Sequence, residues 1–165
     1  STKLSSHLEK LLCNLHVIQK KLCIGAFAPI EKEPLWNSSL SSDYQKLTAF
    51  PAFDALVMQM IFKKAEMSDL MIKEDFGVKI KGPSDSAPKV VPDVILIPGL
   101  AFNQKGERLG RGKGFYDKFL ENFHGIKIGI CFSEQLLDGL LPTEEHDELV
   151  DYIVTEEKII NCKFA

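Results

Sequence analysis

The sequence has little of what would place it in a specialised class of protein. Its four cysteines, Cys13, Cys23, Cys131 and Cys162, form no C-x-x-C pair and have no histidine at zinc-ligand spacing. No apolar run approaches the roughly 20 residues that a membrane-spanning helix requires. No charged start followed by an apolar segment and a small-residue cleavage site is present either. These absences predict reduced thiols, no membrane partner and a cytoplasmic location.

A strong excess of charge of either sign is also missing. The chain has 20 Lys and Arg against 23 Asp and Glu, a net charge of −3. A protein that binds nucleic acid through its surface carries a basic face or stripe, so this composition predicts no nucleic-acid partner. Any anion site must therefore be local. With 165 residues, 45% of them hydrophobic, the chain is predicted to form a single domain over residues 1–165.

Helical and extended patterns alternate along the chain. Ser6 and Glu9 have the spacing of a capping box ahead of helically spaced leucines, which predicts a helix over about residues 6–15. Other segments predict strands at 22–28, 47–53, 55–62, 90–100, 126–132 and 150–154, helices at 65–74 and 115–123, and a surface connection at 77–92. The pattern predicts one three-layer α/β domain around a central sheet that is largely parallel or mixed.

The most informative segment is NQKGERLGRGKGFYDKFL, residues 103–120. It joins a continuous apolar run to a helix, where parallel α/β sheets form their ligand sites. Its glycines let main-chain N–H groups approach an anion closely. Arg108, Arg111 and Lys113 provide charge for phosphate or carboxylate oxygens. Asp117, in the first turn of the helix, could hold Mg²⁺ that bridges to nucleotide phosphates.

The loop alone leaves three interpretations open. It is not a Walker A loop, because Glu107 stands where a glycine is needed and Gly114 replaces the Ser or Thr after the lysine. It is not G-x-G-x-x-G, because Phe115 occupies the third glycine position. A phosphate site, a basic surface turn without a ligand and an RNA-backbone contact all remain compatible with it. The lack of a basic stripe or aromatic platform elsewhere argues against RNA.

Beyond these general features, PGLAFNQKGERLGRGKGFYDKFL resembles the signature of the 5-formyltetrahydrofolate cyclo-ligases, also called 5,10-methenyltetrahydrofolate synthetases. Further segments resemble that family in the same order: F-S-E-Q at 132–135, Pro142 with His146-Asp147, and V-D-x-I-V-T-E at 150–156. The resemblance is close over residues 90–157 and weaker but collinear over 20–62. It implies a fold like that of the ribose-phosphate isomerase and CoA-transferase domains.

The resemblance implies an ATP- and Mg²⁺-dependent ring closure of 5-formyltetrahydrofolate. The γ-phosphoryl group of ATP would activate the formyl oxygen, and N10 would then displace phosphate, giving 5,10-methenyltetrahydrofolate, ADP and phosphate. The implied partner is this small-molecule substrate, and the implied state is a monomer or weak homodimer. The alternative is a non-catalytic folate- or nucleotide-binding relative of the same fold.

The resemblance also implies roles for individual residues. Those implied to be catalytic are Arg111, Lys113 and Tyr116, and those implied to hold Mg²⁺ are Asp117 and Asp147. The nucleotide cradle would consist of Arg108, Leu109, Gly110, Arg111, Gly112, Lys113, Gly114, Phe115 and Tyr116. The folate would contact Ala28, Glu33, Arg111 and Tyr116.

Several positions depart from the family pattern. Members commonly have Ile-x-Glu-Pro before the central strand, whereas FGVKIKGP places Gly82 before Pro83 and has no glutamate. Phe115 stands where many members have a second tyrosine, and Asn103 stands where an aspartate is usual. The sequence starts at what resembles the second family helix, so the basic first helix that reaches ATP is expected to be absent from it.

Overall fold

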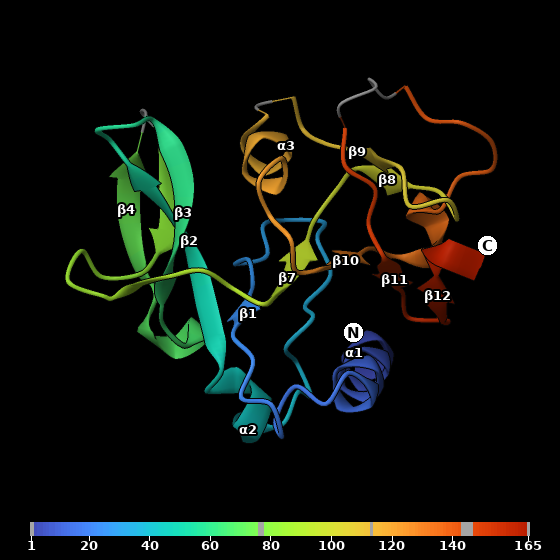
Figure 1. The fold of residues 1–165 in the computed structure, drawn as a ribbon, viewed down its shortest axis with the longest axis horizontal. Helices are drawn as coiled ribbons and strands as arrows, with labels where there is room; N and C mark the ends of the chain where they lie inside the picture. Colours follow the sequence, from blue (N-terminus) through green and yellow to red (C-terminus); the bar gives the residue numbers. More distant parts are fainter. Residues whose placement is uncertain (1, 76–77, 113, 143–146, 165) are drawn as a thin grey trace.

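The architecture is built on one large mixed sheet. A computed structural model describes residues 2–75, 78–112, 114–142 and 147–164. The sheet has eight strands in the order β12-β11-β10-β7-β1-β2-β3-β6 (Figure 1). The strands are β1 (Ile24–Gly25), β2 (Thr48–Asp54), β3 (Gln59–Lys64), β6 (Lys89–Val90), β7 (Val94–Ile97), β10 (Ile126–Ile130), β11 (Tyr152–Val154) and β12 (Ile159–Asn161). The strands β11, β10, β7, β1 and β2 pair in parallel with one another in this order. The pairs β11–β12, β2–β3 and β3–β6 are antiparallel.

Short helices and two antiparallel ribbons surround this sheet. The ribbons pair β4 (Met71–Asp75) with β5 (Val78–Gly82), and β8 (Ala101–Phe102) with β9 (Arg108–Leu109). The helices are α1 (Thr2–Asn14), α2 (Ser42–Gln45) and α3 (Phe115–Leu120), with 3₁₀ turns η1 (Met67–Asp69), η2 (Ser133–Gln135) and η3 (Cys162–Phe164). Helices α1 and α2 lie on one side of the sheet and α3 on the other, which gives the expected three layers (Figure 1).

Strand β7 shows why a continuous apolar run belongs at the centre. All four of its residues are fully buried. Successive side chains of a strand point to opposite faces. Accordingly, Val94 and Leu96 pack in the core under α1, while Ile95 and Ile97 pack in the core under α3. The prediction of a strand covered on both faces is confirmed.

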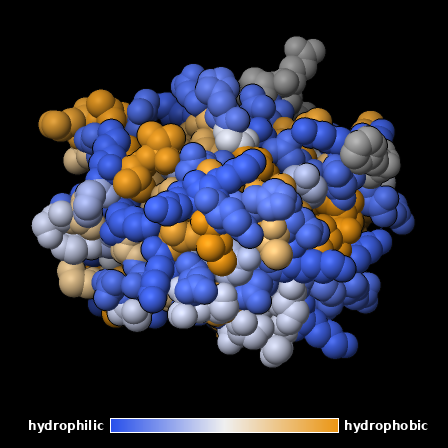
Figure 2. All heavy atoms as spheres, turned by 60° about the horizontal axis from the view of Figure 1, so that its bottom comes forward, coloured by the Kyte–Doolittle hydropathy of each residue, from blue (hydrophilic) through white to orange (hydrophobic). Residues whose placement is uncertain are grey.

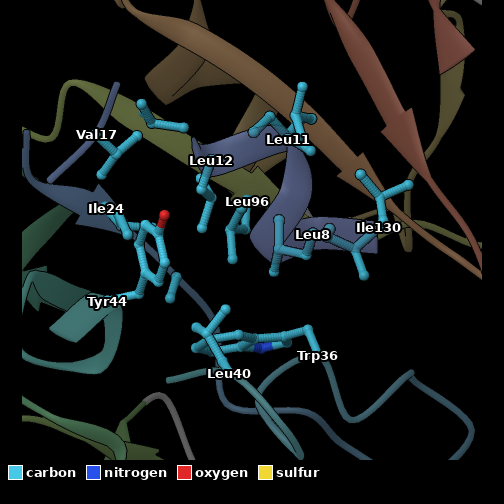
Figure 3. Packing of buried hydrophobic residues seen from close by; sticks show 14 of the residues in the cluster. Leu8, Leu11, Leu12, Val17, Ile24, Trp36, Leu40, Tyr44, Leu96 and Ile130 are labelled. Atoms are coloured by element: carbon cyan, nitrogen blue, oxygen red, sulfur yellow. The ribbon is translucent and has the colours of Figure 1, made fainter. Parts of the chain in front are cut away.

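The core on the α1 side rests on leucines at helical spacing. Leu4, Leu8 and Leu12 are completely buried in this core. Figure 3 shows Leu8 and Leu12 beside Leu96 of the sheet. Trp36 closes this core from below, and its indole Nε1–H donates to the Phe27 carbonyl at 2.8 Å. Truncation of one such leucine to alanine typically costs about 2–5 kcal/mol. This core contributes a large part of the stability of the fold.

Several predicted elements differ from those observed. Helix α1 already includes Thr2, so Ser6 lies inside it and does not cap it. The predicted helix at 65–74 is wrong beyond η1, because β4 follows at once. The predicted connection at 77–92 contains β5 and β6, and the prediction ended before β12. The turn of the β2–β3 hairpin covers 55–58 instead of residues 53–54, with the Leu56 N–H donating to Asp54 Oδ1 at 3.0 Å.

The surface agrees with the balanced composition. Figure 2, which brings the lower side of Figure 1 forward, shows hydrophobic residues in separate patches divided by hydrophilic ones. Within residues 2–75, 78–112, 114–142 and 147–164, no helix has the length and apolarity to span a membrane.

Candidate active site

A cleft of about 660 Å³ lies beside the carboxyl ends of β1 and β7. This is where ligands bind in open parallel sheets, and the volume is typical of small-molecule sites. Its lining comes from the segments after β1 and β7, from β2 and β3, from the β4–β5 hairpin, and from the loop leading into α3. The lining residues are Phe27, Ala28, Pro29, Ile30, Glu33, Pro51, Met60, Ile72, Lys79, Ile80, Lys81, Pro98, Arg108, Gly110, Arg111, Gly112, Gly114, Phe115, Tyr116 and Asp117.

The cleft brings together most of the residues singled out in the sequence. Ala28 and Glu33 line it together with the glycine loop, although about 80 positions separate them from Arg111 in the chain. Leu109 pairs with Ala101 in the β8–β9 ribbon and is not among the lining residues. Lys113 and His146 lie outside the described residues.

Glycine is required in the loop for two different physical reasons. Gly112 and Gly114 have φ of +93° and +71°, a region that L side chains rarely adopt, although a Cβ would meet nothing within 4 Å at either position. Gly110 has an ordinary φ, but a Cβ there would lie 2.9 Å from Nη1 of Arg108. The loop thus combines an unusual backbone path with close contact to an arginine.

Arg108 is the most firmly held cation of the cleft. Its Nε donates to the Pro98 carbonyl at 2.7 Å, its Nη1 lies 3.5 Å from Asp117 Oδ1, and its guanidinium lies 5.3 Å from the centre of the Tyr116 ring. Only 9% of the side chain is exposed. Burial lowers the pKa of Arg108, while Asp117 acts in the opposite direction. An arginine still stays charged under such conditions, so the wall carries a fixed positive charge.

Tyr116 supplies a neutral hydroxyl beside that charge. It is half-buried in the first turn of α3 and lines the cleft. Burial raises the pKa of its phenol, and the neighbouring Arg108 offsets only part of this. The hydroxyl therefore stays protonated at neutral pH and is available as a hydrogen-bond donor.

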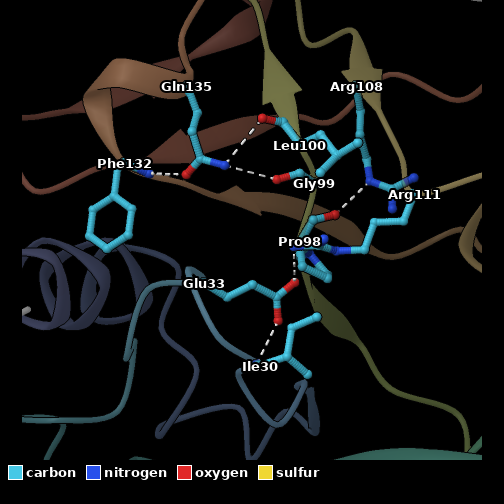
Figure 4. A network of polar contacts seen from close by, with 9 residues as sticks. All are labelled: Ile30, Glu33, Pro98, Gly99, Leu100, Arg108, Arg111, Phe132 and Gln135. Carbon is cyan, nitrogen blue, oxygen red and sulfur yellow. Dashed lines mark hydrogen bonds and ion pairs between the residues drawn. The ribbon is translucent and has the colours of Figure 1, made fainter. Parts of the chain in front are cut away.

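Glu33 and Arg111 connect the segment after β1 to the glycine loop. Glu33 Oε1 accepts the Ile30 N–H at 2.9 Å, and its Oε2 accepts from Nη2 of Arg111 at 3.3 Å (Figure 4). The Glu33 side chain is 7% exposed, against 43% for Arg111. Glu33 is therefore a fixed acceptor inside the cleft, and Arg111 is held through Nη2 of its guanidinium while much of its side chain stays exposed.

Gln135 braces the same region, although the sequence suggested no role for it. Its Nε2 donates to the Gly99 and Leu100 carbonyls at 3.1 and 3.2 Å, and its Oε1 accepts the Phe132 N–H at 2.8 Å (Figure 4). The turn after β7, whose Pro98 carbonyl receives Arg108, is thus held by η2. The resemblance of the F-S-E-Q segment to the family pattern pointed to Gln135, but it did not indicate which groups Gln135 contacts.

Comparisons with known proteins identify the family and the fold of this chain. Residues 3–156 match the family model of the 5-formyltetrahydrofolate cyclo-ligase family. The chain belongs to this family. Among curated members, it is 33% identical over 120 residues to a probable cyclo-ligase of Schizosaccharomyces pombe, which covers 62% of this chain and 56% of that protein. It is 38% identical over 116 residues to the mouse cyclo-ligase, covering 64% and 57%.

The chain spans about half the length of the curated cyclo-ligases that it matches, since 48% of the Escherichia coli K12 protein is covered at 37% identity. Among solved structures, a 5,10-methenyltetrahydrofolate synthetase of Aquifex aeolicus matches with a TM-score of 0.76 and 27% identity, over 98% of this chain and 82% of that one. A synthetase of Mycoplasma pneumoniae matches with a TM-score of 0.64 and 22% identity, over 93% and 83%. These likenesses confirm the predicted α/β fold with its large, mostly parallel sheet.

Asp117 and Asp147 are the two aspartates that the family resemblance implies to hold Mg²⁺, and both interact with Arg108. Asp117 lines the cleft with 41% of its side chain exposed, and Asp147 acts on the pKa of Arg108. Among the described residues, no group of three or more His, Cys, Asp and Glu could hold a metal ion. Proteins usually bind Mg²⁺ with one or two carboxylates and complete its shell with water and substrate phosphates. The residues present fit that shared form of binding.

Two of the positions that depart from the cyclo-ligase family pattern, Asn103 and Phe115, have a local structural explanation. Asn103 Oδ1 accepts the N–H groups of Lys105 and Glu107 at 3.1 and 3.0 Å, as an aspartate could. Its Nδ2 also donates to Glu107 Oε1 and to the Gly139 carbonyl at 2.6 and 2.8 Å, which an ionised aspartate could not do. The ring of Phe115 packs edge-on against Phe53 with 4.5 Å between centroids, so the missing hydroxyl is replaced by an aromatic contact.

Proposed function

We propose that the protein catalyses the ATP- and Mg²⁺-dependent cyclisation of 5-formyltetrahydrofolate to 5,10-methenyltetrahydrofolate, with release of ADP and phosphate. The observation that carries this proposal is the contact between Glu33 and Arg111, which joins the segment after β1 to the glycine loop within one cleft. A folate acceptor and phosphate donors are thereby available in the same site. The names of the relatives support the same reaction.

The reaction needs a way to make a poor leaving group depart. The formyl oxygen attacks the γ-phosphorus of ATP, the bond from that phosphorus to the ADP oxygen breaks, and the formyl carbon becomes electrophilic. N10 then forms the new C–N bond and gives up its proton, and the oxygen leaves as phosphate. Phosphoryl transfer depends mainly on positioning and on neutralising charge.

The residues of the cleft divide this work. Arg111, Lys113 and the N–H groups of Gly112 and Gly114 would hold the phosphates, since cations and glycine backbones suit anionic oxygens. Arg108 keeps a buried charge next to them. Tyr116 would donate its hydroxyl hydrogen bond where nucleotide and folate meet.

Glu33 and Ala28, which line the wall after β1, would contact the folate. Glu33 is the acceptor of that wall, because its buried carboxylate suits the N–H groups of a pterin ring. Asp117 and Asp147 would hold Mg²⁺, which supplies charge neutralisation to the phosphates when bound.

A non-catalytic folate- or nucleotide-binding relative is the second candidate. It is favoured by one observation, the absence of the family's glutamate in FGVKIKGP, where Lys79 and Lys81 line the cleft. Two of the thiols are poorly nucleophilic at neutral pH, which is compatible with either candidate. Burial raises the pKa of Cys131 to about 12 and that of Cys162 to about 11.

One assay separates the two candidates. The protein is incubated with 5-formyltetrahydrofolate and Mg-ATP, and the absorbance of methenyltetrahydrofolate is followed. We expect a steady rise that Arg111→Ala slows through a higher KM for ATP and that Asp117→Asn slows through loss of the metal. No rise, with folate binding intact by calorimetry, would favour the non-catalytic relative. Wild-type rates in both variants would show that the phosphates bind elsewhere.

A further inference from the structure

The turn between β8 and β9 holds two points of the chain outside the ribbon itself. One is the Gly139 carbonyl, which accepts from Asn103 Nδ2 at 2.8 Å. The other is the Val150 N–H, which donates to the Gly106 carbonyl at 2.9 Å. Asp147, one of the two carboxylates proposed to hold Mg²⁺, lies in the segment that these two points enclose. The turn is therefore placed to fix both ends of that segment.

Asn103 is a fixed side chain within this turn, and only 3% of it is exposed. Its Oδ1 accepts the N–H groups of Lys105 and Glu107, while its Nδ2 donates to Glu107 Oε1 at 2.6 Å as well as to Gly139. A flipped amide would place its NH₂ group against two N–H donors, so these contacts select one orientation. The Gly139 carbonyl is thus bound to a rigid group.

Gly106 holds the second point through a close approach of two main chains. Its N–H donates to the Asn103 carbonyl at 3.0 Å, which makes it part of the same turn. Its φ is +91°, and a Cβ at this position would lie 2.4 Å from the Val150 carbonyl oxygen. Asp147 precedes Val150 by three positions, so their Cα atoms are at most about 11 Å apart. The hydrogen bond at Val150 therefore limits where the carboxylate can lie.

The same turn leads directly into the charged part of the cleft. Glu107, which Asn103 contacts, is followed by Arg108, whose Nη1 lies 3.5 Å from Asp117 Oδ1. Burial lowers the pKa of Arg108, and both Asp117 and Asp147 act in the opposite direction, so both carboxylates lie near this guanidinium. A displaced end of the segment would change the distance between the two carboxylates that would share Mg²⁺.

We propose that Asn103 is a positioning residue for Asp147, and that its amide fixes the segment that brings this carboxylate to the metal. The inference rests on the proposed function, in which Asp147 holds the Mg²⁺ of the nucleotide. Loss of a group that orients a metal ligand typically lowers metal affinity by about 10- to 100-fold. An ionised aspartate, the residue usual at this position in the family, would face two acceptors here, Glu107 and the Gly139 carbonyl. Asn103 and Glu107 thus act as a matched pair of amide and acid.

Asn103→Asp tests this pair, because it places a carboxylate against Glu107 and removes the donor to Gly139. Two properties are measured: hydrogen exchange of the Val150 N–H, and calorimetric binding of ADP with and without Mg²⁺. We expect both the protection of Val150 from exchange and the affinity for Mg-ADP to fall about tenfold. The affinities for metal-free ADP and for 5-formyltetrahydrofolate should change little, because Asn103 contacts neither proposed site directly.

Matched variants separate the pairing from a general effect of charge. Glu107→Gln alone should change the affinity for Mg-ADP little, since its side-chain oxygen can still accept from Asn103. N103D/E107Q should recover part of the affinity that Asn103→Asp loses, because the amide at position 107 can donate to the new carboxylate. Asn122→Asp makes the same exchange at an exposed position beyond α3 and should follow wild type. Circular dichroism checks that every variant is folded.

Several results would overturn the positioning role. Faster exchange at Val150 with unchanged affinity for Mg-ADP would mean that Asn103 only stabilises the fold. Unchanged exchange would break the link between the turn and the segment, and equal losses for ADP, Mg-ADP and folate would indicate a general loss of structure. No recovery in N103D/E107Q would overturn the pairing of amide and acid.

The proposed function can fail separately. A wild type that binds Mg-ADP but gives no rise in methenyltetrahydrofolate absorbance would overturn the proposed reaction and leave the role of Asn103 standing. A wild type whose affinity for ADP does not respond to Mg²⁺ would instead remove the metal site from both proposals.

Discussion

The two walls of the cleft are built in opposite ways. On the side formed by the glycine loop and the segment after β1, which we call the glycine-loop wall, Arg108 and Glu33 are held by hydrogen bonds to main-chain groups, and Gln135 braces the turn behind them. On the wall formed by the β4–β5 hairpin, Ile72 is 73% exposed and the lysines of β5 are unpaired among the described residues. A preorganised wall suits chemistry, because charges that are already in position need no rearrangement during reaction. An open wall suits selection between ligands.

The largest expected effect on this contrast comes from substitution of Arg108. Arg108→Leu removes a buried cation and leaves the Pro98 carbonyl without its donor. We expect turnover to fall about 100-fold, the size of losing one preorganised donor, and stability to fall by about 2 kcal/mol. The latter corresponds to a drop in Tm of about 5 °C, measured by calorimetry. Arg108→Lys, which keeps the charge but not the fork of donors, should recover part of the turnover. Full activity in Arg108→Leu would refute the preorganised wall.

Glu33 tests whether the two sequence-distant segments act together. Glu33→Gln keeps an oxygen for the Ile30 N–H but loses the charge that holds Arg111. We expect KM for the folate to rise about tenfold, or about 1.4 kcal/mol. The matched control is Glu31→Gln, an exposed carboxylate two positions away. Equal effects of the two substitutions would mean that Glu33 acts only through general charge.

The difference between the two walls also explains which parts of the cleft could be predicted from the sequence. Glycine spacing and clustered cations predicted the loop, since its chemistry is local. The contact between Glu33 and Arg111 depends on β1 and β7 being neighbours, which only tertiary structure decides. The hairpin was missed because the Lys, Gly and Pro content of 77–92 outweighed the alternation in VKIK, which is the period of a strand. The part of the cleft from Arg108 to Asp117 was therefore predictable from residues that are close in sequence, whereas Ala28 and Glu33 were indicated only by the family resemblance.

Gln135 should have a smaller effect, because it acts through another residue. Gln135→Met removes its donations to the Gly99 and Leu100 carbonyls, and Leu100 is itself exposed. We expect a loss of about 1 kcal/mol in stability and a roughly threefold rise in KM for ATP, with kcat little changed. If Gln135 is a positioning residue for Arg108, the two substitutions are not additive, and Arg108→Leu costs less in the Gln135→Met background. Strict additivity in kcat/KM would separate Gln135 from this wall.

The smallest effect is a pH dependence in the anchor of η2, which carries Gln135. Glu156 accepts the N–H and the hydroxyl of Ser133 at 2.6 and 2.8 Å. Burial acts to raise the pKa of Glu156, but the bonds from Ser133 outweigh it, and the pKa lies below its ordinary value. A carboxyl with a depressed folded-state pKa stabilises the fold above its ordinary pKa, and this stability is lost as the pH falls through the folded-state value.

Glu156→Gln should therefore flatten the acid side of the Tm profile and leave the difference between pH 7 and pH 8 unchanged. Glu157→Gln, at the neighbouring exposed position, is the control and should follow wild type. KM for ATP in wild type should begin to rise over the same acidic range, because loosening η2 also loosens the turn that receives Arg108. A Tm profile that shifts while KM stays constant would mean that η2 stabilises the fold without supporting the preorganised wall.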